Sequence, residues 1–426
     1  MASLKDLKGQ GHTPTLFMAF LYFDMSFMVW TMLGPLSTEI SEALALSGHI
    51  MSAGEKATLL SLPILSGAIL RIILGFGVDK LGAKTTALIS QLIVIVALLS
   101  AYFMGSDISY NQLLIVALGL GFAGASFAVA LPQAGQWYPP RLQGVVLGIA
   151  GAGNIGVVID FLFAPKIAEI WGWNMVFGVG AFMAIVVFIA YVLFAFDAPS
   201  HVYKKNPKRL KDYVNLLKDK DTWWFSLFYA ISFGGFVGIA GYMKVYLMNT
   251  YSADMATFGT EIMNENNVKV IAGYFGALCI FAGAILRPYG GSTADRIGGV
   301  KSLYFFYTAV VILVIITAVI DLPFYASIVV LFLMMANLGM ANGAVFQLVP
   351  QRFAKDIGIM TGIVGCAGGL GGTALIQTLG WSKGTFDGYS VGFLIFALVL
   401  IVAIVGLSMV KTRWRTTWGV QAGGII

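Results

Sequence analysis

The sequence is poor in charged residues, cysteine and histidine. Only 11% of its 426 residues are Asp, Glu, Lys or Arg, against about 25% in an ordinary soluble domain. Its two cysteines, Cys279 and Cys366, both lie in apolar stretches and offer no disulfide framework. Its three histidines fall outside the apolar stretches, and no cluster has metal-ligand spacing. We therefore expect no metal and no cofactor, and the absence of a nucleophile elbow or a phosphate-binding loop argues against an enzyme.

Long apolar stretches make up most of the chain, in which 58% of the residues are hydrophobic. About 20 apolar residues are enough for a helix to cross a bilayer. The backbone there must be helical, because its polar groups find no water to bond. The sequence thus predicts an all-α membrane protein with twelve transmembrane helices, at residues 15–37, 57–78, 86–104, 112–134, 144–166, 174–197, 223–248, 269–292, 301–320, 323–347, 357–379 and 388–410.

The basic residues of the connecting segments are distributed unevenly. With the N-terminus inside, 19 of the 26 Lys and Arg residues fall in inner segments and 4 in outer ones, and Arg71, Lys244 and Arg287 remain within spans. Because inner loops of membrane proteins are enriched in Lys and Arg, we expect a multi-pass inner-membrane protein with both termini in the cytoplasm. This bias explains the net charge of +6 without a nucleic-acid partner.

The chain contains an internal repeat. Residues 66–82 match residues 282–298 at 8 of 17 positions without a gap, and Gly124–Phe127 resembles Gly343–Phe346. Such parallel repeats build the two pseudo-symmetric six-helix halves of major facilitator transporters, which bind substrate between the halves. We expect halves at 1–197 and 223–426, joined by a basic cytoplasmic linker at 198–222.

The repeated segment ends in a charged loop motif that is typical of this superfamily. An acidic residue at a helix end can hold a neighbouring helix through its dipole and so favour one conformation. The duplication favours a role as a transporter gate over a merely charged loop. The motif comprises Gly75, Asp79, Lys80 and Gly82 after span 2, and Gly291, Asp295, Arg296 and Gly298 after span 8.

Arg71 and Arg287 hold equivalent positions near the middle of spans 2 and 8. An arginine in the hydrocarbon region is costly unless it is paired or faces water. One alternative is a salt bridge in each half with Asp24 of span 1 or Asp160 of span 5. The other is that both guanidinium groups face a common centre, where they repel each other unless an anion lies between them. Arginine suits that task because it is always charged and offers a planar fork of donors.

Spans 5 and 11 are rich in glycines spaced three and four residues apart, from Gly144 to Gly156 and from Gly358 to Gly372. This spacing places glycines on one helix face, where a partner helix can approach closely. Asn154 lies inside the first stripe, and a buried amide needs a hydrogen-bonding partner. Helix packing alone explains the stripes, and a surface that brings Asn154 near the cargo is a second reading.

The stretches 124–157 and 358–373, together with Phe27–Trp30 and Tyr229–Phe236, resemble the nitrate/nitrite porter family of the major facilitator superfamily. The resemblance covers nearly the whole chain. It implies one central site that holds a small inorganic anion, nitrate or nitrite, with Arg71 and Arg287 as its cationic residues. It also implies a hydrogen bond from Tyr229, aromatic brackets from Phe127 and Phe233, and a role for Asn154. Phe346 is added as the repeat partner of Phe127.

The expected mechanism is rocker-type alternating access by a monomer in the lipid bilayer. The anion would neutralise the repulsion between the arginines and permit closure, which favours nitrate/nitrite exchange. Asp24 and Asp160 leave proton symport open if either faces the cavity and titrates. Exchange of another small anion, such as formate or oxalate, is an alternative. A transporter-like sensor is disfavoured because the longest loop is about 25 residues.

Overall fold

The computed structural model describes residues 9–139, 142, 146, 149–199, 210–263, 265–353 and 356–421. Within these residues the regular secondary structure is entirely helical. Eleven of the described helical segments are long and apolar enough to cross a membrane. The long helices are α1 (Thr13–Thr31), α3 (Ala53–Leu81), α4 (Ala83–Met104), α5 (Tyr110–Gly124), α6 (Phe127–Gln136), α8 (Gly156–Trp171), α9 (Trp173–Phe194), α12 (Lys220–Phe258), α13 (Val268–Ile297), α14 (Gly299–Val319), α15 (Phe324–Arg352), α16 (Ile357–Phe386) and α17 (Ser390–Thr416).

Each of the twelve predicted spans has a helical counterpart among the described residues. The first predicted span corresponds to α1, which has 19 residues and includes Asp24. It is not among the eleven helical segments that are long and apolar enough to cross a membrane. The fourth is divided between α5 and α6, and the fifth is described from Ile149 through the 3-10 turn η4 (Ala152–Ile155) into α8. Gly144, Gly148 and linker residues 200–209 lie outside the described residues. The all-α, twelve-helix prediction is confirmed.

Three short segments were not expected. Helix α2 (Ser37–Leu46) follows α1, the π-helical turn η5 (Gly259–Met263) follows α12, and helix α11 (Leu210–Leu217) lies in the described part of the linker. The remaining short segments are η2 (Gly105–Asp107) and α18 (Trp418–Gln421).

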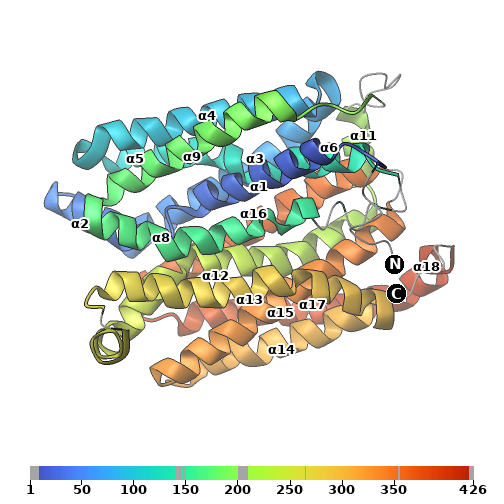
Figure 1. Cartoon of the computed structure of the whole chain (residues 1–426). Helices are drawn as coiled ribbons and strands as arrows, with labels where there is room; N and C mark the ends of the chain where they lie inside the picture. The colour runs from blue at the N-terminus through green and yellow to red at the C-terminus, as the bar shows by residue number, and fades with distance from the viewer. Residues whose placement is uncertain are drawn as a thin grey trace.

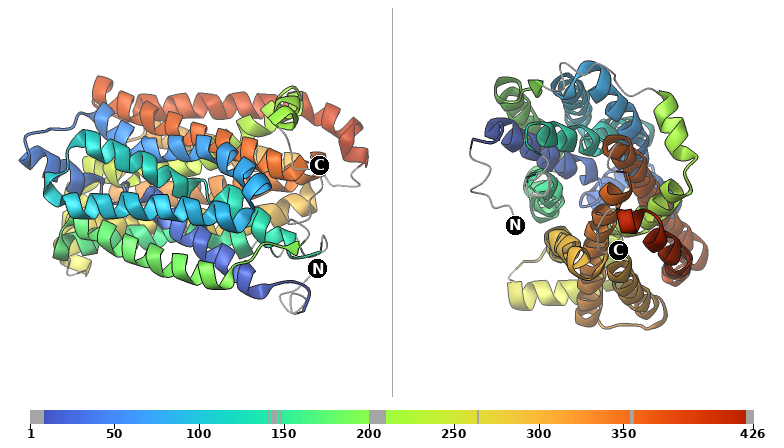
Figure 2. Two further views of the ribbon diagram at one scale, coloured as in Figure 1. Left: turned by 90° about the horizontal axis from the view of Figure 1, so that it is seen from above. Right: turned by 90° about the vertical axis from the view of Figure 1, so that its right-hand side faces the viewer.

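The helices run along one common direction (Figure 1). In that view α1–α9 lie mostly above α12–α15 and α17, and α16, which packs on both α3 and α12, lies between the two groups. Helix α1 begins and α17 ends at the same end of the bundle, which we call the termini end. We call the opposite end, where α2 lies, the α2 end. The view from the termini end shows the helices nearly end-on (Figure 2).

Local sequence signals fix where the helices start and stop. Ser52 and Glu55 form a capping box that begins α3, and Ser109 and Gln112 form another that begins α5, so backbone N–H groups that lack helical partners are satisfied. Gly82 ends α3 with φ +85° and Gly298 ends α13 with φ +100°. Only glycine adopts such values easily, so the two repeat-related glycines end two repeat-related helices in the same way.

Contacts between the halves rest on small residues. Helix α3 packs on α16, and α8 packs on α13. A methyl group at Gly369 of α16 would lie 2.6 Å from the Ala68 side chain, and one at Gly273 of α13 would lie 2.6 Å from the Phe161 carbonyl oxygen. The glycine stripe of span 11 thus permits close helix approach, as expected of small residues in membrane interfaces.

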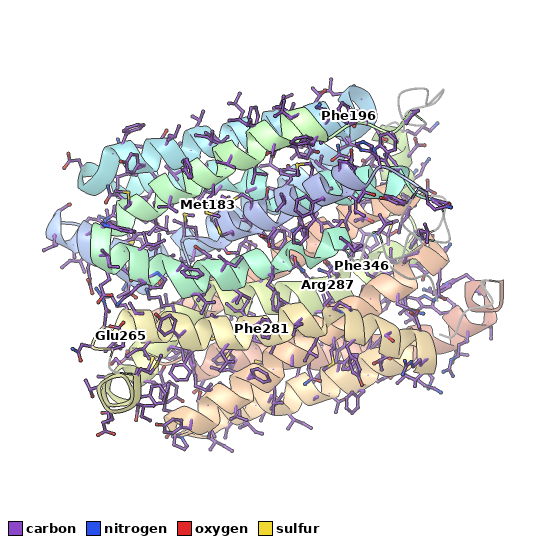
Figure 3. All side chains as sticks on the ribbon, in the orientation of Figure 1. Met183, Phe196, Glu265, Phe281, Arg287 and Phe346 are labelled. Carbon is purple, nitrogen blue, oxygen red and sulfur yellow. The ribbon has the colours of Figure 1, made fainter. Side chains whose placement is uncertain are left out.

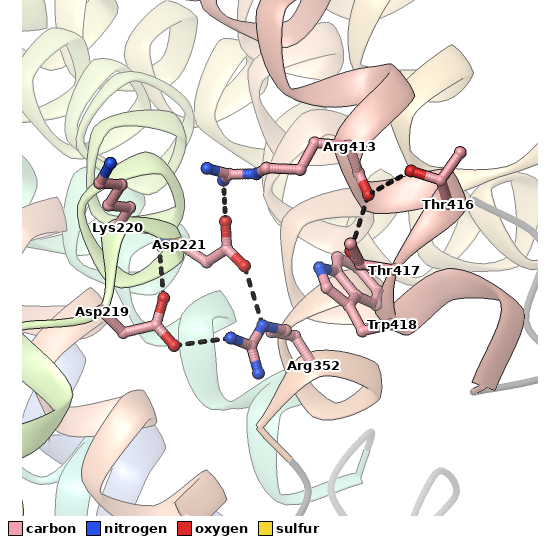
Figure 4. Close-up of a pocket in the computed structure, with 8 residues that line it drawn as sticks. All are labelled: Asp219, Lys220, Asp221, Arg352, Arg413, Thr416, Thr417 and Trp418. Carbon is pink, nitrogen blue, oxygen red and sulfur yellow. Dashed lines mark hydrogen bonds and ion pairs between the residues drawn. The ribbon is translucent and has the colours of Figure 1, made fainter.

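At the termini end, a charged cluster joins three helices of the C-terminal half (Figure 4). Arg352 of α15 donates to Asp219 at 2.6 Å and to Asp221 of α12 at 2.8 Å. Asp221 also pairs with Arg413 of α17 and accepts from Trp414 Nε1 at 2.7 Å. The cluster holds the ends of α12, α15 and α17 together.

Candidate anion site

Arg71 lies in the interior of the bundle and is only 1% exposed. Its Nε donates to the carbonyl oxygen of Gly124 at 3.1 Å, and its Nη1 donates to that of Gly365 at 2.6 Å. The second bond crosses from the N-terminal to the C-terminal half. Nη2 is buried without a partner. Aromatic rings lie around the guanidinium group, with centroids 5.1–5.5 Å from Cζ, from Phe233, Trp30 and Phe127.

The break between α5 and α6 explains why the Gly124 carbonyl is available. In a regular α-helix it would accept from the N–H of Ala128, but that N–H bonds to Ala125 instead, at 3.0 Å. The displaced carbonyl is a buried acceptor that needs a donor. Arg71 supplies that donor, and the carbonyl in turn orients the arginine.

Arg287 of α13 occupies a different setting. Its Nη1 is buried without a hydrogen-bonding partner, and its Cζ lies 5.8 Å from the centre of the Phe346 ring. Figure 3 shows Arg287 and Phe346 next to each other inside the bundle. Helix α15 runs unbroken past Gly343, the repeat partner of Gly124, so the C-terminal half offers no equivalent free carbonyl. Arg71 is anchored, whereas Arg287 keeps free donor capacity.

Tyr229 and Phe233 lie one turn apart on α12, and the Phe233 ring packs against the Arg71 guanidinium group. The Tyr229 hydroxyl group is buried, and no group lies in hydrogen-bonding geometry with it. It does lie within electrostatic reach of both guanidinium groups. Its ring stacks on Phe233 at 5.1 Å with planes 4° apart. Gly368 of α16 makes this possible, because a methyl group there would lie 2.7 Å from Tyr229 and 2.8 Å from Phe233.

The remaining predicted rings join the same cluster. Phe127 meets Phe346 edge to face at 5.9 Å, and Phe346 meets Tyr229 at 4.8 Å. The structure therefore brings together six of the seven predicted binding residues from both halves: Arg71, Arg287, Tyr229, Phe127, Phe233 and Phe346.

Asn154 is the seventh. It lies in η4, is 3% exposed, and its Oδ1 has no hydrogen-bonding partner. It hydrogen-bonds to neither arginine, so its membership of the cluster stays a prediction.

Neither arginine forms an ion pair with a carboxylate among the described residues. Asp24 of α1 has a buried Oδ1 without a partner, and Gly153 and Gly156 pack on its backbone. Asp160 of α8 is 3% exposed, its Oδ2 has no partner, and it lies within electrostatic reach of Lys244. The two acids therefore do not cap the arginines.

The first copy of the loop motif lies at the termini end. Gly82 begins α4, where the Lys84 N–H donates to Asp197 Oδ1 at 2.9 Å. A side chain at Gly82 would meet the Asp197 carboxylate at 2.5 Å. The Lys80 ammonium lies 4.5 Å from the Phe76 ring centre.

The described linker helix α11 contacts this motif. A methyl group at Gly75 would lie 3.6 Å from the Tyr213 hydroxyl. Burial, and then the nearby Asp79 charge, raise the pKa of Tyr213 to about 12. In the second copy, Gly291 faces Gly343, Gly298 ends α13, and Asp295 and Arg296 are exposed. Whether either copy acts as a gate stays a prediction.

Sequence reasoning missed several groups around Arg71. Trp30 lies against its guanidinium group and donates from Nε1 to the Pro63 carbonyl at 2.8 Å. The carbonyls of Gly124 and Gly365 are backbone groups, which residue types cannot reveal. Cys366, beside Gly365, lies within electrostatic reach of Arg71.

This cluster is rich in donors and cationic, and rings surround its charged groups. Buried donors without acceptors favour a ligand that brings acceptors and negative charge. Among the described residues, no group of three or more His, Cys, Asp or Glu could hold a metal ion.

Comparison with known proteins agrees with this reading. Residues 15–375 match the family model of the Major Facilitator Superfamily. A probable nitrate/nitrite transporter NarK2 of Mycobacterium tuberculosis is 31% identical over 92% of this chain and 95% of its own. The chain belongs to the nitrate/nitrite porter family of the major facilitator superfamily.

Other relatives of this porter include the nitrite extrusion protein of Bacillus subtilis, 30% identical over 89% of both chains. A probable nitrate/nitrite antiporter NarK1 of Thermus thermophilus is 27% identical over 91% of this chain and 89% of its own. A bacterial homolog of the human lysosomal transporter Spinster has the same fold, with a TM-score of 0.67 at 16% identity over 93% of this chain and 96% of that one. The porter is therefore a multi-pass membrane protein with the major facilitator fold.

Proposed function

We propose that this porter carries nitrate, nitrite or both across the cytoplasmic membrane by rocker-type alternating access. One observation carries the proposal: Arg71 and Arg287, at repeat-related positions in opposite halves, have no carboxylate partner among the described residues, and both lie within electrostatic reach of one hydroxyl group, that of Tyr229. The names of the relatives support the choice of anion.

In this proposal the anion lies between the two halves. Arg71 Nη2, Arg287 Nη1 and the Tyr229 hydroxyl, all without partners at present, donate to its oxygens. Phe127, Phe233 and Phe346 bracket its planar faces, and Asn154 adds an amide. Arginine forks suit such an oxyanion because they offer parallel N–H donors.

The anion also sets the coupling between the halves. Two guanidinium groups in a medium of low dielectric constant repel each other, and an anion between them removes this repulsion. A ligand shifts a conformational equilibrium only by its different affinity for the two states. The loaded site therefore closes more easily than the empty one, which favours nitrate/nitrite exchange.

We place the termini end in the cytoplasm and the α2 end outside. The basic segments that the sequence predicts to be inside, such as those around Lys80, Arg296 and Arg352, lie at the termini end, whereas Lys56, Lys166, Lys269 and Lys383 lie toward the α2 end. This arrangement agrees with the positive-inside tendency. The loop motif near Gly82 and Gly298 then belongs to a cytoplasmic gate.

The test is anion uptake by Arg71→Lys and Arg287→Lys in proteoliposomes. Each variant keeps the positive charge but loses the planar fork, so we expect a fall of at least about tenfold in kcat/KM with unchanged thermal unfolding. Arg415→Lys, at an exposed position of α17, is the matched control. Transport at the wild-type rate by both arginine variants would contradict the proposal.

Another small planar anion, such as formate, or a dicarboxylate such as oxalate, is the second candidate, because paired arginines also suit carboxylates. Competition distinguishes them. Formate or oxalate that displaces labelled nitrate from the purified porter at equal or lower concentration would favour the carboxylate.

A further inference from the structure

Lys244 is the third cation inside a span, and the anion site leaves it unused. It lies 15 residues beyond Tyr229 on α12, roughly 22 Å toward the α2 end at the helical rise. Its side chain is 0% exposed. The ammonium group donates to the Pro35 carbonyl at 2.5 Å and to both Glu39 oxygens, at 2.6 and 2.8 Å.

These bonds cross from one half to the other. Lys244 belongs to the C-terminal half, whereas Pro35 precedes α2 and Glu39 lies on it, in the N-terminal half. Two more pairs cross the halves at the same end: Lys269 with Glu42, and Lys166 with Glu265 at 2.7 Å. Figure 3 shows Glu265 at the α2 end.

At the termini end, the ion pairs that Arg352 and Arg413 form with Asp219 and Asp221 stay within the C-terminal half and the residue that caps α12. The packing of α16 also differs between its two ends. A methyl group at Gly380 would collide with Ala57 of α3, whereas one at Gly358 would meet no atom within 4 Å. The halves are thus joined at the α2 end and less closely packed beyond Arg71.

The three crossing pairs are not equivalent. The side chains of Lys269 and Glu42 are 26% and 55% exposed, and exposed pairs contribute little because water screens them. Lys244 is enclosed, and an enclosed ammonium without its partner is strongly unfavourable. Glu42 and Asp160, the other acids within its electrostatic reach, also belong to the N-terminal half, so they withdraw together with Glu39 when the halves part.

We propose that Lys244 is the switching residue of the outer gate: it pairs with Glu39 while the α2 end is closed, and it binds the incoming anion once the halves part there. When the halves part at the α2 end, the buried Lys244–Glu39 ion pair is broken and the Lys244 ammonium group is left in the outer entrance without a partner. An incoming anion can then pair with this ammonium group. The direction of entry and the identity of the anion rest on the proposed function, whereas the gate itself does not.

The gate is tested without substrate. In Cys279→Ser, the remaining thiol is Cys366, beside the site at Arg71. A membrane-impermeant maleimide added to the α2 side of sealed vesicles reaches it only through an open outer gate. We expect Lys244→Gln and Glu39→Gln to react at least about tenfold faster than the Cys279→Ser parent, and Lys269→Gln to stay within about twofold. Equal rates for Lys244→Gln and Lys269→Gln would overturn the gate.

Anion binding by Lys244 is tested by kinetics. Glu39→Gln loses the gate pair but keeps the cation, and the double variant Lys244→Gln with Glu39→Gln loses both, so the difference between these two variants reflects the missing cation. Relative to Glu39→Gln, we expect KM for external nitrate to rise about fivefold in the double variant, with kcat little changed, KM from the internal side to stay constant, and Lys244→Arg with native Glu39 to keep the external KM low. An equal rise from both sides, or none, would overturn this role. If nitrate is not transported at all, the proposed function fails, while the labelling experiment still decides the gate.

Discussion

The two arginines of the candidate site have the same position in the repeat but different partners. Two of the three guanidinium nitrogens of Arg71 donate hydrogen bonds to backbone carbonyls, one of which lies in the opposite half. In contrast, Nη1 of Arg287 has no hydrogen-bonding partner. Local backbone geometry causes this difference, because the helix breaks after Gly124 and not after Gly343. We interpret Arg71 as the fixed member of the pair and Arg287 as the member that is free to follow an anion.

The Tyr229 hydroxyl offers the sharpest single-atom prediction. Tyr229→Phe keeps the stacked ring but removes a donor that would bond to a charged ligand, a contribution of about 1.5–2 kcal/mol. We expect nitrate affinity to fall roughly 10- to 30-fold, measured by calorimetry or binding competition.

The matched control is Tyr242→Phe, on the same helix and equally buried, but packed against Tyr389 outside the cluster. It is expected to change thermal stability alone. Equal affinities for both variants and the wild type would remove Tyr229 from the site.

At the scale of the element, α16 combines two tasks. Its glycines permit contact with α3 near Gly369, and the same helix leaves room for the stacked rings of Tyr229 and Phe233 at Gly368. A single helix therefore carries both the interface between the halves and one wall of the candidate site, so movement along the interface also changes the site.

A pair of substitutions on α16 separates the site from general helix packing. Gly368→Ala would press a methyl group into both rings, and overpacking of this kind costs about 1–3 kcal/mol. We expect uptake to fall about fivefold or more.

Gly358→Ala, with no atom within 4 Å of the new methyl group, is expected to leave uptake and thermal unfolding unchanged. Similar activity in the two variants would show that the glycine stripe does not shape the site.

On the scale of the whole molecule, the halves meet through α3 with α16 and α8 with α13, and the buried Lys244–Glu39 pair reinforces the α2 end. In the proposed mechanism, the charges of Arg71 and Arg287, one in each half, oppose closure when the site is empty. The whole-molecule behaviour expected from this arrangement is exchange and not net flow.

Proteoliposomes test this expectation directly. We expect rapid nitrate uptake when the lumen holds nitrite, and uptake at least about tenfold slower when it holds none, because the empty site resists closure. An imposed proton gradient is expected to have no effect. Gradient-driven uptake into an empty lumen would show symport, and Asp24→Asn and Asp160→Asn would then identify which acid carries the proton.

Much of the architecture follows from patterns in the sequence. Apolar length predicts the spans, the match of residues 66–82 with 282–298 predicts the halves, and equivalent arginines predict a shared centre. The break at Gly124 was not predicted, because a run of small apolar residues is compatible with a continuous helix. Helix α2 was not predicted, because the predicted first span ends at residue 37 and includes only the first residue of this helix, Ser37.

By itself, the sequence determined that the chain spans a membrane as paired six-helix repeats with one arginine near the middle of a span in each half. These features depend on hydrophobic length, periodicity and repetition, which are local properties of the chain. Only the tertiary structure decided that Arg71 bonds to Gly124 and Gly365, that Nη1 of Arg287 is buried without a hydrogen-bonding partner, and that Lys244 pairs with Glu39 in the other half. Such partners lie 53, 294 and 205 residues apart in sequence, and contacts over these separations arise from how whole helices pack.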